Sequence, residues 1–224
     1  MIKAVIFDLY ETLITEWVSR KYLSSQCAGE LGIDPALFRE MWNSHHHAMD
    51  TGRRTYRQVL AEMMIAAGNT SDDALINACE KKRIDGKNDC FAKIDEGILQ
   101  MLSALKQQGL RLCLCSNCSA DEVEGLSASP LFPFFDAIVL SYQVGLIKPD
   151  KQIYLHCANA LSVLPEECLF VGDGGSKELF GAQSAGMHPL RALWFLEKYQ
   201  SSIQEMPFPA AHMPAEVMNY ITTF

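Results

Sequence analysis

The feature that most constrains the fold is a short apolar run ending in a carboxylate near the start of the chain. Residues 4 to 7 read Ala-Val-Ile-Phe, and Asp8 follows directly. Such a run is typical of a strand buried on both faces of a parallel sheet. An aspartate at the carboxyl end of that strand lies where open α/β sheets bind ligands. Aspartate also begins turns and caps helices, so Asp8 alone does not define a site.

The composition excludes several classes of protein. The 224 residues are 49% hydrophobic and 21% charged, with a formal net charge of -8. This acidic balance disfavours binding to nucleic acid or to a membrane surface, and no stretch approaches the roughly 20 apolar residues of a membrane span. Asp8 and Glu11 interrupt the first apolar stretch, unlike a signal peptide. We therefore expect a cytoplasmic protein with reduced cysteines.

A long helical interval separates the first strand from the next strand candidate, Leu110–Cys115. Two parallel strands need only a dozen or more residues and one helix between them, whereas about a hundred residues intervene here. The periodicity predicts helices from near Glu16 to Gly32, from Pro35, from Thr55 to Gly68 and from Ser71 to about Arg83. Residues 16–90 are therefore predicted to form an inserted helical subdomain, with hinges near Thr15 and Cys90.

The rest of the chain shows the strand-helix alternation that is typical of a parallel α/β sheet. The predicted strands are Leu110–Cys115, Ala137–Leu140, Cys168–Val171 and Pro189–Trp194. The predicted helices are Asp95–Gln108, Ala120–Leu126, Asp150–Ser162 and Ser176–Ala185. Gln200 to Pro214 is expected to be a loop, and a last short helix is expected from Pro214.

Polar residues follow these strands where each one ends. Asp8 follows the first strand, Ser116-Asn117 the second, Lys148-Pro149 comes a loop after the third, and the turn from Gly172 to Ser176 follows the fourth. Carboxyl ends of parallel strands meet at one edge of a sheet, so these groups are expected in one crevice. Glycines and helix N-terminal amides favour an anion there, and paired carboxylates favour Mg²⁺.

These segments resemble a known set of motifs. Phe7-Asp8-x-Tyr10-x-Thr12-Leu13, Ser116-Asn117, Lys148-Pro149 and Val171-Gly172-Asp173 are similar, in order and spacing, to the four motifs of the haloacid dehalogenase-like hydrolase superfamily. Each motif is weak alone, and the four together are specific. The resemblance implies a Rossmann-like parallel sheet flanked by helices, formed by residues 1–15 and 91–224. It also implies an all-helical cap, residues 16–90, inserted after the first strand.

The resemblance implies roles for the residues of the crevice. Asp8 would be the nucleophile that forms a covalent aspartyl intermediate. Lys148 would balance the charge of the transferring group and contact the substrate, and Thr12 would orient the Asp8 loop. Ser116, Asn117 and Tyr10 would bind the substrate.

The resemblance also implies a metal site. Asp8, the main-chain carbonyl of Tyr10 and Asp173 would bind Mg²⁺, and Glu178 would orient a metal-bound water. Arg53 lies in a loop between two predicted cap helices. It is either a solvated turn residue or a guanidinium that recognises a substrate anion.

Tyr10 departs from the phosphatase pattern. Phosphatases of this superfamily usually have a second aspartate two residues after the nucleophile, whereas a tyrosine there resembles the 2-haloacid dehalogenases. Three interpretations therefore stay open: a Mg²⁺-dependent phosphatase of a small phosphorylated metabolite, a 2-haloacid dehalogenase, and a non-catalytic ligand-binding relative. The first is favoured, because the Gly172-Asp173 turn supplies a metal carboxylate.

Overall fold

The computed structural model describes residues 1–221 and contains one six-stranded sheet in which all strand pairs are parallel. The strand order is β3-β2-β1-β4-β5-β6, which places β1 at the centre. The strands are β1 (Ala4–Phe7), β2 (Arg111–Ser116), β3 (Ala137–Leu140), β4 (Cys168–Gly172), β5 (His188–Ala192) and β6 (Ala210–Ala211). The predicted α/β class, with a parallel sheet flanked by helices, is confirmed.

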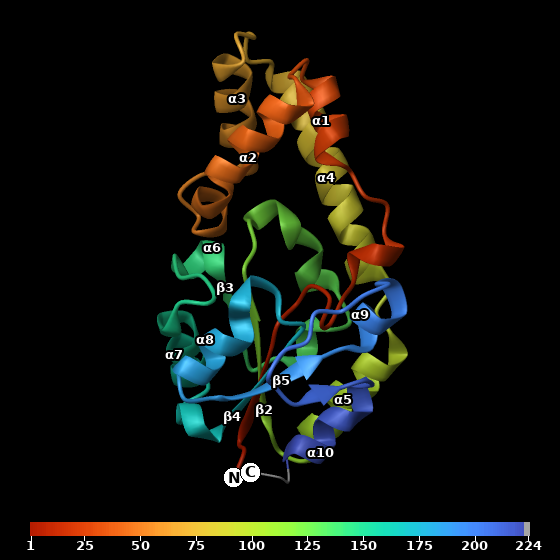
Figure 1. Cartoon of the computed structure of the whole chain (residues 1–224), viewed down its shortest axis with the longest axis vertical. Coiled ribbons are helices and arrows are strands. Elements are labelled where there is room, and N and C mark those ends of the chain that lie inside the picture. Colours follow the sequence, from red (N-terminus) through yellow and green to blue (C-terminus); the bar gives the residue numbers. More distant parts are fainter. Residues whose placement is uncertain (222–224) are drawn as a thin grey trace.

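Helices cover both faces of this sheet, and four more form a separate group beyond its carboxyl edge (Figure 1). The helices are α1 (Ser24–Glu30), α2 (Pro35–Asp50), α3 (Tyr56–Ala66), α4 (Asp73–Ala92), α5 (Glu96–Gln107), α6 (Ser141–Val144), α7 (Lys151–Ala160), α8 (Glu178–Ser184), α9 (Trp194–Tyr199) and α10 (Val217–Ile221). None of the helices within residues 1–221 is long and apolar enough to cross a membrane.

The four residues of β1 are completely buried because the strand is covered on both faces. Side chains alternate along a strand. Val5 and Phe7 therefore pack into the core beneath α5 and α10, while Ala4 and Ile6 pack into the core beneath α7 and α8. Hydrogen bonding to β2 and β4 on either side fixes where β1 ends, and so where Asp8 lies.

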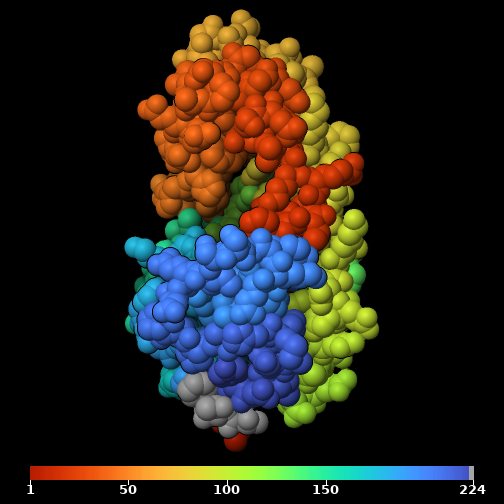
Figure 2. Space-filling view, turned by 45° about the vertical axis from the view of Figure 1, so that its right-hand side comes forward, coloured from red at the N-terminus to blue at the C-terminus, as the bar shows by residue number. Residues whose placement is uncertain are grey.

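Helices α1 to α4 have a hydrophobic core of their own. Its members come from all four helices and the turns between them, and include Cys27, Phe38, Leu60, Met63 and Ile76. The group stands above the carboxyl edge of the sheet (Figure 1), and the space-filling view shows a recess between it and the core (Figure 2). Side chains at the ends of β1, β2 and β4 therefore face the inserted helices.

Two predicted cap helices were wrong in extent. The helix expected from Glu16 is a single 3₁₀ turn, Glu16–Val18, and α1 begins only at Ser24. The last cap helix was expected to end near Arg83, but α4 continues to Ala92. Gly86 looks like a helix breaker in the sequence. Its missing side chain serves the approach of the preceding linker, because a Cβ there would lie 2.6 Å from the carbonyl oxygen of Arg20.

Several predictions for the core also needed correction. The helix expected over Ala120–Leu126 is a pair of 3₁₀ turns, Ala120–Glu122 and Glu124–Ala128. The strand expected to reach Trp194 ends at Ala192, because Trp194 begins α9. Helix α6 and the short strand β6, which lies in the expected loop Gln200–Pro214, were not predicted.

Candidate active site

Asp8 lies directly after β1 and is 7% exposed. Its main-chain N–H donates a hydrogen bond to the carbonyl of Val171 (2.9 Å), so the parallel pairing with β4 continues past the strand end. The hydroxyl of Thr12 donates to Oδ2 of Asp8 (3.2 Å), and the ammonium group of Lys148 donates to Oδ1. Both carboxylate oxygens are therefore held by neighbouring side chains.

Lys148 lies between two carboxylates. Its Nζ contacts Asp8 and lies 2.5 Å from Oε2 of Glu178, and the residue is only 4% exposed. Burial would lower the pKa of Lys148, but the charges of Asp8 and Glu178 raise that pKa well above its ordinary value. A buried ammonium group is therefore fixed at the centre of the site, where it can balance an anion.

Asn117 fixes the main chain of Lys148. Its Oδ1 accepts a hydrogen bond from the N–H of Lys148 (2.8 Å), and its Nδ2 donates to the carbonyl of the same residue (2.9 Å). These bonds use both ends of the amide, so the structure gives Asn117 a positioning contact, whereas substrate contact by Asn117 stays a prediction. Ser116, at the end of β2, is buried beside it.

The turn after β4 brings two more acids to Asp8. Asp8, Asp173 and Glu178 each offer an oxygen atom, and these atoms lie within 4.8 Å of one another. The N–H of Gly174 donates to Oε1 of Glu178 (3.2 Å), which fixes this side chain under the turn. A Cβ at Gly172 would lie 2.1 Å from the same oxygen, so a larger residue there would displace the carboxylate of Glu178.

This donor set fits a magnesium ion. Burial and the charge of Asp8 raise the pKa of Asp173, and the same two causes raise the pKa of Glu178. The three acids lie close together in a buried place, and Lys148 contacts two of them, Asp8 and Glu178. A hard divalent cation with oxygen ligands would relieve that repulsion.

The other two predicted site residues are Tyr10 and Arg53. The side chain of Tyr10 is directed to a neighbouring turn, where its hydroxyl donates to the carbonyl of Glu122 (2.6 Å). Arg53 is exposed in the turn between α2 and α3. Within residues 1–221, no side-chain hydrogen bond or ion pair joins Arg53 to the Asp8 site, so its contact with a substrate stays a prediction.

Two residues that support the site were not found in the sequence. The indole N–H of Trp194 donates to the carbonyl of Thr12 (2.9 Å), and the guanidinium of Arg191 donates to the carbonyl of Asp173 (3.0 Å). Arg191 belongs to β5, which pairs with β4, and Trp194 begins α9, the element that follows β5. Both fall within the strand predicted over Pro189–Trp194, with Trp194 as its last residue, and that position was the only signal in the sequence.

A buried carboxylate, a lysine and an acidic cluster that could hold a metal ion lie together at the carboxyl edge of a parallel sheet, which is typical of a hydrolase with a Rossmann-like fold. The sequence matches the haloacid dehalogenase-like hydrolase family over residues 2–186, and the chain belongs to that family.

Individual relatives are similar over most of the chain. A glyceraldehyde 3-phosphate phosphatase from Methanopyrus kandleri is 28% identical over 85% of this chain and 84% of its own length. A 2-haloacid dehalogenase from Pseudomonas syringae has a TM-score of 0.73 at 22% identity, covering 100% of this chain and 99% of that one. A Bacteroides thetaiotaomicron family enzyme, solved as a mutant with magnesium and inorganic phosphate, has a TM-score of 0.61 at 19% identity, covering 86% and 94%. The two structures share the fold.

Proposed function

We propose that the protein is a Mg²⁺-dependent phosphatase of a small phosphorylated metabolite and that it acts through an aspartyl-phosphate on Asp8. The observation that carries this proposal is the convergence of oxygen atoms from Asp8, Asp173 and Glu178 within 4.8 Å, next to the ammonium group of Lys148. Similarity to glyceraldehyde 3-phosphate phosphatases supports a phosphate ester as substrate. Such a metabolite fits the cytoplasmic location proposed from the sequence.

The proposed reaction has two steps. An oxygen of Asp8 attacks the phosphorus, forming one P–O bond while the ester P–O bond breaks and the leaving oxygen takes up a proton. Water then attacks the phosphorus of the aspartyl-phosphate, which releases inorganic phosphate and restores the carboxylate. Thr12 keeps the second oxygen of Asp8 in place, and the hydroxyl of Ser116 binds the phosphoryl oxygens.

Lys148 and the metal ion would neutralise different negative charges in the site. Lys148 balances the charge of the phosphoryl group, as its burial between two acids allows. Asp8, the carbonyl of Tyr10 and Asp173 would hold Mg²⁺, and Glu178 would act beside them. When bound, the ion neutralises negative charge, so that the Asp8 carboxylate can approach the anionic phosphate.

We propose that residues 16–90 form a cap that closes over this site. The helices of this region have a core of their own and face the carboxyl edge of the sheet (Figure 1). Closure would exclude water while the substrate reacts. The contact of Gly52 with the core, where a Cβ would lie 2.1 Å from the carbonyl oxygen of Tyr142, brings the turn that carries Arg53 to the rim of the recess. Arg53 is therefore proposed as a substrate contact.

A second function is favoured by one residue. Tyr10 stands where phosphatases usually have their second aspartate, and the phenol of a tyrosine is a poor base for activating water. A 2-haloacid dehalogenase would use Asp8 to displace a halide from carbon, without the metal. A non-catalytic relative would do neither reaction.

One assay series separates these functions. The protein is incubated with p-nitrophenyl phosphate, with Mg²⁺ or with EDTA, and in parallel with 2-chloropropionate while chloride is measured. We expect release of p-nitrophenol that EDTA abolishes, and no chloride. Chloride release in EDTA would identify a dehalogenase, and no reaction in either assay would favour a binding protein. Asp8→Asn, purified in the same way, is the control for contaminating enzymes.

A further inference from the structure

Tyr10 is held by two contacts, one from the core and one from the inserted helices. Its hydroxyl donates to the main-chain carbonyl of Glu122 (2.6 Å), and the ammonium group of Lys87, on α4, lies 4.5 Å from the centroid of its ring. Burial, with the charges of Glu122 and Glu16, raises the pKa of Tyr10 well above its ordinary value, so the hydroxyl remains a donor. The position of Tyr10 therefore depends on Glu122 and Lys87 together.

Glu122 joins the core to α4 through its carboxylate. The group accepts a hydrogen bond from the N–H of Ser119 (3.1 Å), one from the guanidinium of Arg83 (2.8 Å), and lies 2.9 Å from the ammonium group of Lys87. Burial alone would raise the pKa of Glu122, but Lys87 and Arg83 lower it to about 2. The carboxylate is thus charged and its two cationic partners both come from α4.

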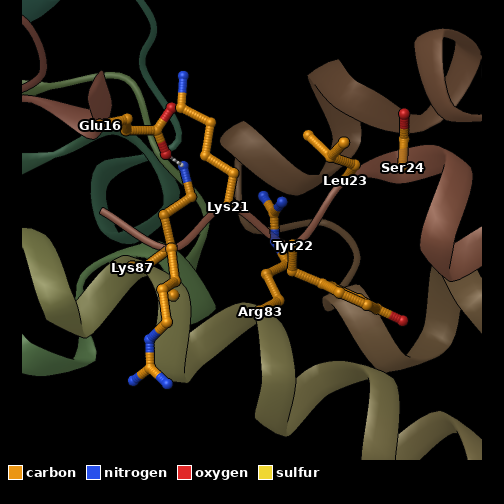
Figure 3. A pocket seen from close by; sticks show the side chains of 9 residues that line it. Glu16, Lys21, Tyr22, Leu23, Ser24, Arg83 and Lys87 are labelled. Carbon is orange, nitrogen blue, oxygen red and sulfur yellow. Dashed lines mark ion pairs between the residues drawn. The ribbon is translucent and has the colours of Figure 1, made fainter. Parts of the chain in front are cut away.

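Those two cations also form part of the wall of a pocket between α4 and residues 20–24 (Figure 3). The pocket has a volume of about 190 Å³. Nζ of Lys87 lies 2.5 Å from Oε1 of Glu16, which also lines the pocket, and Nε of Arg83 lies 2.6 Å from Oδ2 of Asp121. Because these two cations already have acidic partners, this wall of the pocket is one face of an ionic cluster.

We propose that Glu122 is a positioning residue that couples helix α4 of the cap to Tyr10 and thereby to the loop after Asp8. Its carboxylate binds the two cations of α4, and its carbonyl binds the hydroxyl of Tyr10. A shift of α4 would displace Lys87 and Glu122 and would change both contacts of Tyr10. The position of the inserted helices would then influence where the Tyr10 carbonyl lies relative to the Asp8 carboxylate.

The catalytic consequence rests on the proposed phosphatase function. Tyr10 follows Asp8 by two residues, and its carbonyl is a proposed magnesium ligand. Loss of the Glu122 charge should therefore weaken magnesium binding and lower kcat, while the KM for the ester changes little. Small displacements of catalytic groups cost up to roughly a hundred-fold in rate, so we expect a fall in kcat of about ten- to a hundred-fold.

Glu122→Gln tests the proposal, because it keeps the size of the side chain and removes its charge. The matched control is Glu124→Gln, since Glu124 is an exposed acid in the adjacent 3₁₀ turn. Amide hydrogen exchange of residues 9–15, measured without substrate or metal, is the readout that does not depend on activity. We expect faster exchange in Glu122→Gln and wild-type exchange in Glu124→Gln.

Lys87→Met provides the same test from the cap side. It removes the contact with the Tyr10 ring while leaving the core sequence unchanged, and it should also speed the exchange of residues 9–15. If Glu122→Gln does not fold, the exchange measured in Lys87→Met alone tests the proposal. Unchanged exchange in residues 9–15 in the folded variants would overturn the proposal. If wild type proves inactive on phosphate esters, the proposed function fails, whereas faster exchange would still support the coupling.

Discussion

The side-chain amide of Asn117 binds both main-chain polar groups of Lys148, accepting from its N–H at 2.8 Å and donating to its carbonyl at 2.9 Å. The loop that carries the buried lysine is thus attached to the end of β2. Because Lys148 in turn contacts Asp8, the amide of Asn117 helps to determine how the lysine meets the Asp8 carboxylate.

Asn117→Ala should lower activity more than stability. Two hydrogen bonds are lost, which costs on the order of 1–3 kcal/mol of unfolding free energy, while a displaced Lys148 should reduce kcat/KM by about ten- to a hundred-fold. The control is Asn69→Ala, because Asn69 also donates to two main-chain carbonyls, those of Leu31 and Gly32, but lies among the inserted helices. Equal loss of activity in both variants, measured beside thermal unfolding, would contradict this role.

Gly172→Ala should displace the carboxylate of Glu178, which contacts Lys148. The new methyl group would meet Oε1 of Glu178 at 2.1 Å, and Glu178 cannot move without releasing Lys148. We expect a loss of about 1–3 kcal/mol in unfolding free energy, together with a severe loss of activity. Gly29→Ala is the control, since nothing lies within 4 Å of a Cβ in that helix, and it should leave activity unchanged. Urea unfolding and initial rates of both variants give the comparison.

The site residues at strand ends could be predicted from the sequence, whereas the more distant residues that hold the site in place could not. Asp8, Lys148 and Asp173 were placed in one crevice from the sequence, because carboxyl ends of parallel strands converge whatever the loop details. The contact of Tyr10 with Glu122 depends on a segment whose 3₁₀ turns have no sequence motif. The bond from Trp194 to Thr12 joins residues 182 positions apart, and no local pattern reports it.

The limits of two predicted helices were wrong because contacts with other residues decide where those helices begin and end. The predicted end near Arg83 comes shortly before Gly86, and glycine is a poor helix former. Packing of the preceding linker against α4 offsets that preference, because the Arg20 carbonyl approaches where a side chain would stand. The pattern from Glu16 failed in the opposite direction, because Glu11 accepts a hydrogen bond from Thr15 and one from the Glu16 N–H, which fixes a short turn instead of a long helix.

Removal of magnesium should abolish phosphatase activity, and Asp173→Ala should raise the Mg²⁺ concentration needed for half-maximal rate. Asp173 would supply one of the carboxylate ligands, and its raised pKa reports an acid that lacks a neutralising partner. Glu166→Ala is the control, because Glu166 is an exposed acid just before the opposite end of β4. Magnesium titrations after EDTA treatment give the measurement. Identical magnesium requirements for wild type and Asp173→Ala would exclude Asp173 as a ligand.

The stabilising contribution of the Glu122 carboxylate should be lost in acid. The pKa of Glu122 in the folded protein is about 2, below the ordinary value of 4.5, so the folded form binds fewer protons between those two values. Its contribution, on the order of 3 kcal/mol, is complete above about pH 5 and decreases as the pH falls toward 2. Glu122→Gln should thus be less stable than wild type at pH 7, with a difference that shrinks by pH 3. Urea unfolding at several pH values measures it. A difference independent of pH would contradict the assignment.

The most direct measurement of the central claim locates the covalent intermediate. Wild-type protein is mixed with p-nitrophenyl phosphate and Mg²⁺, quenched during the first turnovers and treated with borohydride, which reduces an aspartyl-phosphate to homoserine. Peptide mass spectrometry then identifies the altered residue. We predict homoserine at position 8, none without substrate, and neither turnover nor modification in Asp8→Asn. Active wild-type protein that gives an unmodified Asp8, or a modified residue elsewhere, would contradict the account.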